Sequence, residues 1–219
     1  MLAASALVSL RQRELFTFTM ALGAACWCVA SLLWLGGRPV YALAPWWIAF
    51  LVLTIAGERL ELSRFLPPSP MARRVFAVLL AGILLGVAIS WFDAAIGTQI
   101  LGFALAGLAL WLMRQDVARR TIKTRGLTRF IAACLLSGYV WLAVGGVSML
   151  LPGGLGSGGA AYDAALHALV LGFVFSMVFG HAPIIFPAVL RVAVPYHSYF
   201  YAPLALLHAS LVIRIAGDW

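Results

Sequence analysis

Seven long apolar runs, separated by short polar or proline- and glycine-rich segments, dominate the amino-acid sequence. Each run comes close to the ~20 residues that an α-helix needs to cross a bilayer. Hydrophobic residues make up 64% of the 219 positions and charged residues 10%, whereas soluble domains carry about 25% charged residues. The sequence therefore predicts an all-α fold, a polytopic transmembrane helix bundle that forms one domain over residues 1–219. The predicted spans are 15–35, 40–57, 75–92, 96–113, 130–151, 164–186 and 199–216.

Lysine and arginine residues are distributed unevenly between the two sides of the predicted bundle. Seven alternating spans place 13 of the 15 Lys and Arg residues on the side of the N-terminus. Because positively charged loops stay in the cytoplasm, we expect a cytoplasmic N-terminus and a periplasmic C-terminus in a bacterial inner membrane. The net charge of +8 is then explained by topology and by anionic lipid headgroups. The lipid bilayer is the expected partner of these charges, and nucleic acid is not.

Motifs of soluble enzymes are absent from the sequence. There is no G-x-x-x-x-G-K-[ST], no H-E-x-x-H, no C-x-x-C and no G-x-S-x-G, so nucleotide hydrolysis, zinc proteolysis and serine hydrolysis have no motif support. Neither a soluble substrate nor a catalytic residue can be named. Three cysteines lie inside apolar runs, and we interpret them as small buried hydrophobic residues, with a copper–thiolate site as the alternative. They are Cys26, Cys28 and Cys134.

Histidines within the apolar runs are the strongest candidates for a functional site, because ionisable residues are costly inside a bilayer. The sixth predicted span contains His167 and His181, and the seventh contains His208. On an ideal α-helix, His167 and His181 lie ~21 Å apart along the axis and ~40° apart around it, too far apart to share one metal ion. Neutral imidazole binds haem and copper, and it also hydrogen-bonds neighbouring helices. All three histidines are therefore candidate cofactor and metal ligands, with helix contacts as the alternative.

Glycines and prolines in the sixth predicted span indicate local features of that helix. Gly172 and Gly180 remove side-chain bulk, which would let a flat macrocycle or another backbone approach. Pro183 and Pro187 are predicted to kink or end the helix just after His181.

Other polar and small residues are interpreted as architectural. Asp163 suits the first turn of the sixth span. Gly82-x-x-x-Gly86 and Gly102-x-x-x-Ala106 predict close packing of the third and fourth spans. Four charged residues follow the second span, and we interpret them as an interfacial charge cluster, with a proton-entry role as the alternative. They are Glu58, Arg59, Glu61 and Arg64.

The run His167-Ala-Leu-Val-Leu-Gly172-Phe-Val-Phe-Ser-Met177, followed by Gly180-His181, resembles a His-Ala-Leu-x-x-Gly-x-x-x-x-Met helix of the NnrS family. Members of that family are bacterial inner-membrane proteins described as containing haem and copper and linked to nitric oxide stress. The family looks distantly like the catalytic subunit of haem–copper oxidases. The resemblance implies haem b or copper as a cofactor, with His167, and after it His181, as ligands. It covers about twenty-five residues, and the family is roughly twice as long, so the chain resembles its C-terminal part.

These observations lead to three hypotheses of different classes. The first is an NnrS-like membrane protein that binds haem or copper and serves electron transfer or the response to nitrogen-oxide stress. The second is a non-catalytic accessory subunit that packs against other membrane subunits of a respiratory or photosynthetic complex. The third is a small transporter or channel, with the Pro183–Pro187 segment lining its pathway. Soret absorption separates the first hypothesis from the third, and co-purification with other subunits favours the second.

Overall fold

Seven helical spans, each long and apolar enough to cross a membrane, make this chain a multi-pass membrane protein and confirm the predicted all-α fold. The computed structural model describes residues 2–62, 68–155, 159–192 and 194–217. A short helix, α1 (Leu2–Arg11), precedes the spans and packs beside α2. The spans are α2 (Leu15–Leu35), α3 (Val40–Leu62), α4 (Pro70–Ile89), α5 (Ala94–Gln115), α7 (Gly126–Ser148), a sixth span over Ala160–Leu190, and a seventh that consists of η3 (Ser198–Phe200) and α10 (Tyr201–Gly217).

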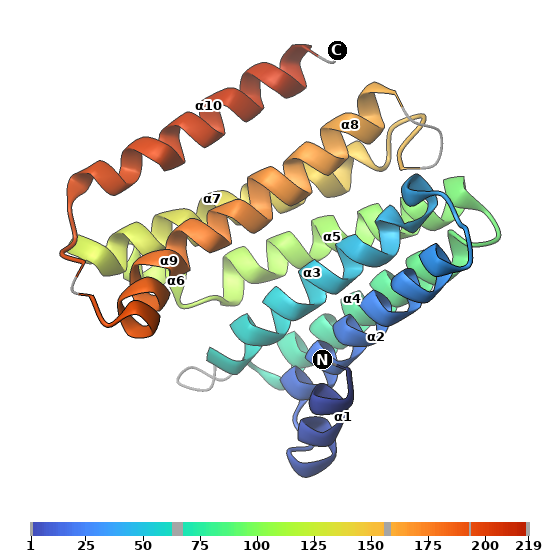
Figure 1. Ribbon diagram of the computed structural model, residues 1–219, viewed down its shortest axis with the longest axis horizontal. Coiled ribbons are helices and arrows are strands. Elements are labelled where there is room, and N and C mark those ends of the chain that lie inside the picture. Colours follow the sequence, from blue (N-terminus) through green and yellow to red (C-terminus); the bar gives the residue numbers. More distant parts are fainter. Residues whose placement is uncertain (1, 63–67, 156–158, 193, 218–219) are drawn as a thin grey trace.

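The spans are arranged as successive antiparallel neighbours (Figure 1). Helices α2 and α3 form one pair, α4 and α5 a second, and α5 also packs on α7. The sixth span lies against α7, while α10 lies at the edge of the bundle with most of its surface exposed. The two termini lie at opposite ends, as an odd number of spans requires (Figure 1). We call the end that holds the α3–α4, α5–α7 and α9–α10 connections the basic end.

Two helix ends differ from the predicted boundaries, and local capping explains one of them. Helix α4 begins at Pro70 instead of residue 75, since the Ser69 side chain accepts a hydrogen bond from the Ala72 N–H at 3.2 Å and proline suits the first helical position. Helix α3 continues to Leu62 instead of ending at residue 57. The charged residues Glu58 and Arg59 therefore belong to the helix and do not follow it.

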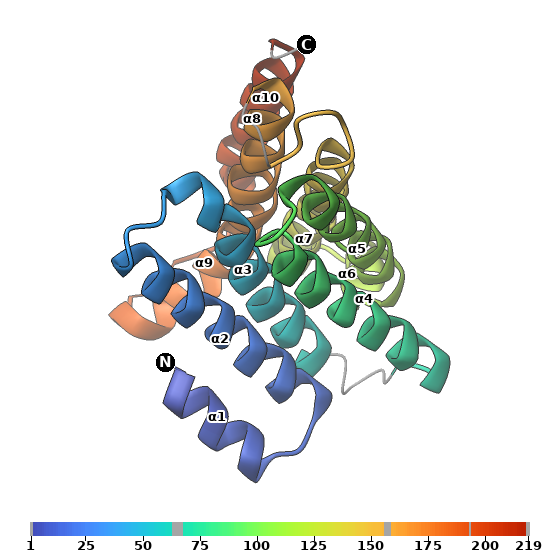
Figure 2. The same ribbon diagram turned by 90° about the vertical axis from the view of Figure 1, so that its right-hand side faces the viewer.

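Of the two predicted effects of the prolines, a kink or an end of the helix, the structure does not show the end. Pro183 and Pro187 both lie inside α9, which continues to Leu190 and ends at Arg191 in the left-handed conformation, with φ 54°. Transmembrane helices tolerate proline where neighbouring groups satisfy the freed backbone. The last turns of α9 do bend away from the preceding axis (Figure 2), which agrees with the predicted kink after His181.

Small residues bring three helices into backbone contact. A Cβ atom added to Gly86 of α4 would lie 2.6 Å from the Leu101 nitrogen of α5, so the predicted α4–α5 packing is confirmed there. Gly102 is expected to face α4, but it faces α7. A Cβ atom added to Gly102 would lie 2.6 Å from the Gly146 carbonyl oxygen. The second small-residue pattern therefore joins the fourth span to the fifth.

Replacing Gly146 with alanine should lower the free energy of unfolding by about 1–3 kcal/mol, because the new methyl group would lie 2.7 Å from the Ala106 nitrogen and 2.8 Å from the Gly102 oxygen. Both atoms belong to the α5 backbone, so the helices must separate. Gly107→Ala is the control, since its Cβ would meet only the Leu79 Cδ2 end of a flexible side chain. Detergent-based equilibrium unfolding measures both variants, and equal losses of stability would contradict the backbone-contact explanation.

Candidate functional site

The sixth span contains a π-helix that begins at His167. The span consists of α8 (Ala160–Leu166), the π-helix η2 (His167–Val174) and α9 (Phe175–Leu190). π-Helical turns are rare and frequently occur at functional sites. Because η2 changes the helical repeat, the angle of about 40° between His167 and His181 expected for an ideal α-helix does not hold in this span.

Gly172 allows η2 to approach α7, as its lack of a side chain predicts. A Cβ atom at this position would lie 2.5 Å from Cγ of Trp141, so the flat group that occupies the space is an indole ring. Gly180 makes a looser approach to the same helix, with its added Cβ 3.1 Å from the Cβ of Cys134. The small residues of the sixth span therefore position it against α7.

His167 is the candidate whose second nitrogen is available. Its Nδ1 lies 2.9 Å from the Asp163 carbonyl oxygen and 3.3 Å from the Asp163 carboxylate. A carbonyl only accepts hydrogen bonds, so in the neutral ring Nδ1 carries the proton and Nε2 carries the lone pair. Among the residues that the structure describes, Nε2 has no hydrogen-bond partner. Metal-ligating histidines have this arrangement, with one nitrogen oriented by an acceptor and the other directed to the metal.

Asp163 also connects the sixth and seventh spans. It lies in the first turn of α8, as predicted, and its carboxylate forms an ion pair with Arg214 of α10. Both side chains are partly exposed, which limits the stability that the ion pair itself contributes. The ion pair does, however, hold the Asp163 carboxylate in place beside His167.

His208 has the opposite tautomer. The indole N–H of Trp141 donates a hydrogen bond of 2.8 Å to His208 Nδ1, and the two rings lie 6.1 Å apart at 30°. Because Trp can only donate, Nδ1 holds the lone pair and Nε2 of the neutral ring carries the proton. Nε2 is buried, and in the described part of the chain nothing accepts its proton. In this arrangement His208 can donate a hydrogen bond from Nε2, but it cannot bind a metal there.

His181 has protein partners at both nitrogens. Its Nδ1 donates to the Met177 carbonyl oxygen at 2.5 Å, and its Nε2 accepts from Arg59 Nη2 at 2.8 Å. The Arg59 side chain is 8% exposed. A metal at His181 Nε2 would therefore have to displace a buried guanidinium.

The buried position of Arg59 corrects its interpretation as a member of an interfacial charge cluster. Helix α3 continues past residue 57 and carries Arg59 on the same buried side as Ala56 and Leu60. Arg64, the last member of the predicted cluster, lies outside the described residues. The contact with His181 bridges 122 positions of sequence, so the spacing of charges within α3 could not indicate it.

A second polar contact joins α7 to the end of α5. The Tyr139 hydroxyl donates to Asp116 Oδ2 at 2.5 Å. Tyr139 is fully buried in α7, whereas Asp116 follows the end of α5. Neither residue stands out in the sequence, because a tyrosine in an apolar run and an aspartate in a basic loop are both common in membrane proteins.

A groove on the side of the bundle reaches His181. It has a volume of about 400 Å³, within the ~300–1,000 Å³ range of small-molecule sites. Thr54 and Glu58 of α3 line one wall, and Met177 and His181 line the other. The remaining lining is apolar, so the groove suits the lipid chains of a bilayer.

The structure does not collect the candidate ligands into one metal centre. Within the described ranges, no group of three or more His, Cys, Asp or Glu side chains lies close enough together to hold a metal ion. Cys26 and Cys134 are buried free thiols, as their interpretation as hydrophobic residues predicts, and Cys28 is half-buried. Each intramembrane histidine has its own set of partners.

A family model described as a domain of unknown function (DUF8744) matches residues 1–219. No curated protein and no solved structure matches the chain.

Proposed function

The chain belongs to the DUF8744 family, and on the basis of its own residues we propose that it is a haem-binding membrane protein, similar to NnrS proteins, in electron transfer or the response to nitrogen-oxide stress. One observation carries the proposal. His167 stands at the first position of a π-helix, with Nδ1 held by a backbone carbonyl and with no protein partner at Nε2 among the described residues. The resemblance of the surrounding helix to an NnrS helix agrees with this assignment.

The geometry favours haem over copper. Protein copper sites take several side-chain ligands, and the described residues contain no group of three that could supply them. Haem iron needs only one proximal histidine from the protein. Bound haem would supply a one-electron redox centre beside the sixth span.

Asp163 is proposed as the residue that positions the ligand. Its carbonyl fixes the Nδ1–H tautomer of His167, and its carboxylate lies 3.3 Å from the same nitrogen. Arg214 holds that carboxylate from the neighbouring span. His208 and His181 stay candidates for a second ligand, but each would first have to leave its present partner, Trp141 or Arg59.

The proposed location is a bacterial inner membrane, with the basic end in the cytoplasm. This orientation rests on the positive-inside rule and puts the N-terminus in the cytoplasm and the C-terminus in the periplasm. His167, at the opposite end of the sixth span from the α9–α10 connection, would then lie toward the periplasmic side.

The proposal is tested by a reduced-minus-oxidised absorption spectrum of the detergent-purified protein, with iron and copper analysis of the same sample. We expect a haem b difference spectrum and about one iron per chain. Copper at one per chain without a haem spectrum would replace haem with copper as the cofactor. A sample with neither chromophore nor stoichiometric metal would refute the cofactor proposal for the isolated chain.

The second candidate function is that of an accessory subunit, which the exposure of α10 favours. Leu206, Val212 and Ile213 of this helix are all strongly exposed, and the helix contacts the bundle along a narrow strip. Such a face can contact lipid or another membrane subunit. Purification from native membranes in mild detergent distinguishes the two, because a subunit would elute with stoichiometric partners.

A further inference from the structure

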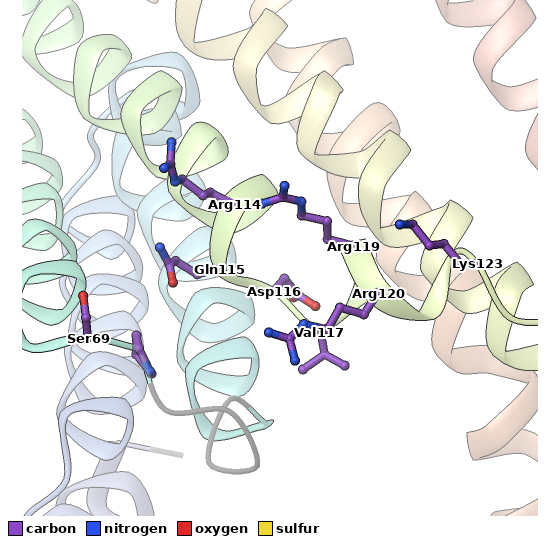
Figure 3. A pocket seen from close by; sticks show the side chains of 9 residues that line it. Ser69, Arg114, Gln115, Asp116, Val117, Arg119, Arg120 and Lys123 are labelled. Carbon is purple, nitrogen blue, oxygen red and sulfur yellow. The ribbon is translucent and has the colours of Figure 1, made fainter.

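A basic pocket lies at the basic end of the bundle, where α5 ends and the short helix α6 (Ala118–Thr121) leads into α7 (Figure 3). Its volume is about 690 Å³, large enough for a charged headgroup or a small anion. Four of its nine lining residues are Arg or Lys, and one is acidic. The lining residues are Pro68, Ser69, Arg114, Gln115, Asp116, Val117, Arg119, Arg120 and Lys123.

The acidic residue of the pocket is already engaged. Asp116 Oδ2 accepts the hydrogen bond from the buried Tyr139 hydroxyl, and Oδ1 accepts one of 2.7 Å from the Ala118 N–H. The second bond ties the carboxylate to the first residue of α6. Within the lining, four positive charges therefore face one carboxylate that is held by other groups, and the pocket carries an excess of positive charge.

The end of α5 and the short helix α6 bring these charged residues together. Arg114 lies in the last turn of α5, and one turn of α6 brings Arg119 and Arg120 back toward it. Figure 3 shows Arg114 and Arg119 extending to the same side of the pocket, with Lys123 pointing toward Arg119. Arg120 extends across the pocket toward Ser69 at the start of α4. The Asp116–Tyr139 hydrogen bond fixes this turn to α7.

We propose that this pocket binds a phosphate group, supplied by the headgroup of an acidic phospholipid. Guanidinium groups bind phosphate through two parallel hydrogen bonds, and three arginines line the cavity. The pocket lies where α4 begins and α5 ends, which is the depth at which spanning helices meet the headgroup layer. Basic pockets at this depth are a recurring form of acidic-lipid recognition.

Topology alone does not explain the pocket. The positive-inside rule requires basic residues in a loop but not their collection around one cavity. Arg73 and Arg74 belong to the same end of the bundle and do not line the pocket. They provide a matched control, because replacing them removes the same charge without touching the cavity.

The test is lipid binding to the purified full-length protein in neutral detergent, measured by native mass spectrometry with cardiolipin, phosphatidylglycerol and phosphatidylcholine. For the wild type we expect tighter binding of the two acidic lipids than of phosphatidylcholine. Arg119→Gln/Lys123→Gln should weaken acidic-lipid binding at least about ten-fold, since it removes two charged contacts to phosphate. The affinity of Arg73→Gln/Arg74→Gln for acidic lipid should stay within about two-fold of the wild-type affinity, because this variant loses no pocket contact.

Two further measurements distinguish the possible sources of phosphate and provide a second pocket variant. If inorganic phosphate displaces bound acidic lipid, the pocket binds phosphate. If the protein binds inorganic phosphate but shows no preference among the three lipids, the phosphate comes from a soluble molecule and the lipid assignment is overturned. Arg114→Gln/Arg120→Gln provides an independent pocket variant if the first pair fails to fold. Equal losses in the pocket and control variants, or a loss in neither, would overturn the site.

Discussion

Under the proposed haem assignment, replacing His167 with alanine should reduce the haem signal of the purified protein to background, whereas His208→Phe should retain it. The reason is the different tautomers of the two rings. His167 Nδ1 donates to the Asp163 carbonyl and leaves a lone pair on Nε2, while His208 receives the Trp141 indole N–H at Nδ1 and holds its proton on Nε2. Absorption at the Soret band, normalised to protein, measures both variants.

Free imidazole provides the internal control for this prediction. A cavity left by a lost ligand can accept imidazole from solution, so added imidazole should restore haem binding to His167→Ala if the side chain acts as a ligand. A merely structural role would not be rescued in this way. Haem retained in His167→Ala and lost in His208→Phe would show that the ligand is assigned to the wrong span.

The fold was predictable because the bilayer imposes a simple requirement on sequence. A spanning helix must be apolar over about 20 residues, so the seven spans follow from hydrophobicity alone, and the described residues contain seven helices of this kind. Their ends depend on other forces. Ser69 starts α4 five residues earlier than hydrophobicity predicts, and a left-handed Arg191 ends α9 beyond both prolines. Capping and proline tolerance are local effects that a hydrophobic window does not register.

The candidate site was only partly predictable, because its polar partners lie far apart in the sequence. The intramembrane histidines could be identified by their cost in a bilayer. Which nitrogen of each ring is free depends on a hydrogen bond to Arg59, to Trp141 or to the Asp163 backbone. The Arg59–His181 contact bridges 122 positions of sequence, and the Trp141–His208 contact bridges 67. The burial of Arg59, unlike its contact with His181, does have a signal in the sequence. Ala56, Arg59 and Leu60 are spaced to lie on one face of α3, and this face is buried. Trp141 has no comparable signal, because tryptophan is expected in apolar runs whatever its contacts.

The direction of a helix face is equally hard to obtain from one sequence. Gly82-x-x-x-Gly86 and Gly102-x-x-x-Ala106 look equivalent, yet Gly86 approaches Leu101 of α5 while Gly102 approaches Gly146 of α7. Small residues indicate that a close helix contact exists. Which helix makes the contact depends on the rotation of each span within the bundle.

His181→Leu should lower the free energy of unfolding by about 2–4 kcal/mol, because it removes a hydrogen-bond partner from a buried arginine. Arg59 is 8% exposed, and its Nε has no partner in the described part of the chain. Without His181 Nε2, which accepts from Nη2 at 2.8 Å, the charge would lose a further contact. Arg59→Met removes the charge and should cost less, about 1–2 kcal/mol, since it leaves only a neutral acceptor unpaired.

The double variant Arg59→Met/His181→Leu distinguishes this explanation from a simple loss of packing. With both polar groups gone, no buried group is left without its partner, so the double variant should be more stable than His181→Leu alone. Equilibrium unfolding in mixed detergent gives the three free energies. Arg59→Met/His208→Leu is the control, and its two effects should add within about 0.5 kcal/mol because His208 contacts Trp141 and not Arg59. If the Arg59–His181 pair were also additive, the hydrogen bond would contribute nothing to stability, and the pair would have to be explained by a role other than holding α3 against α9.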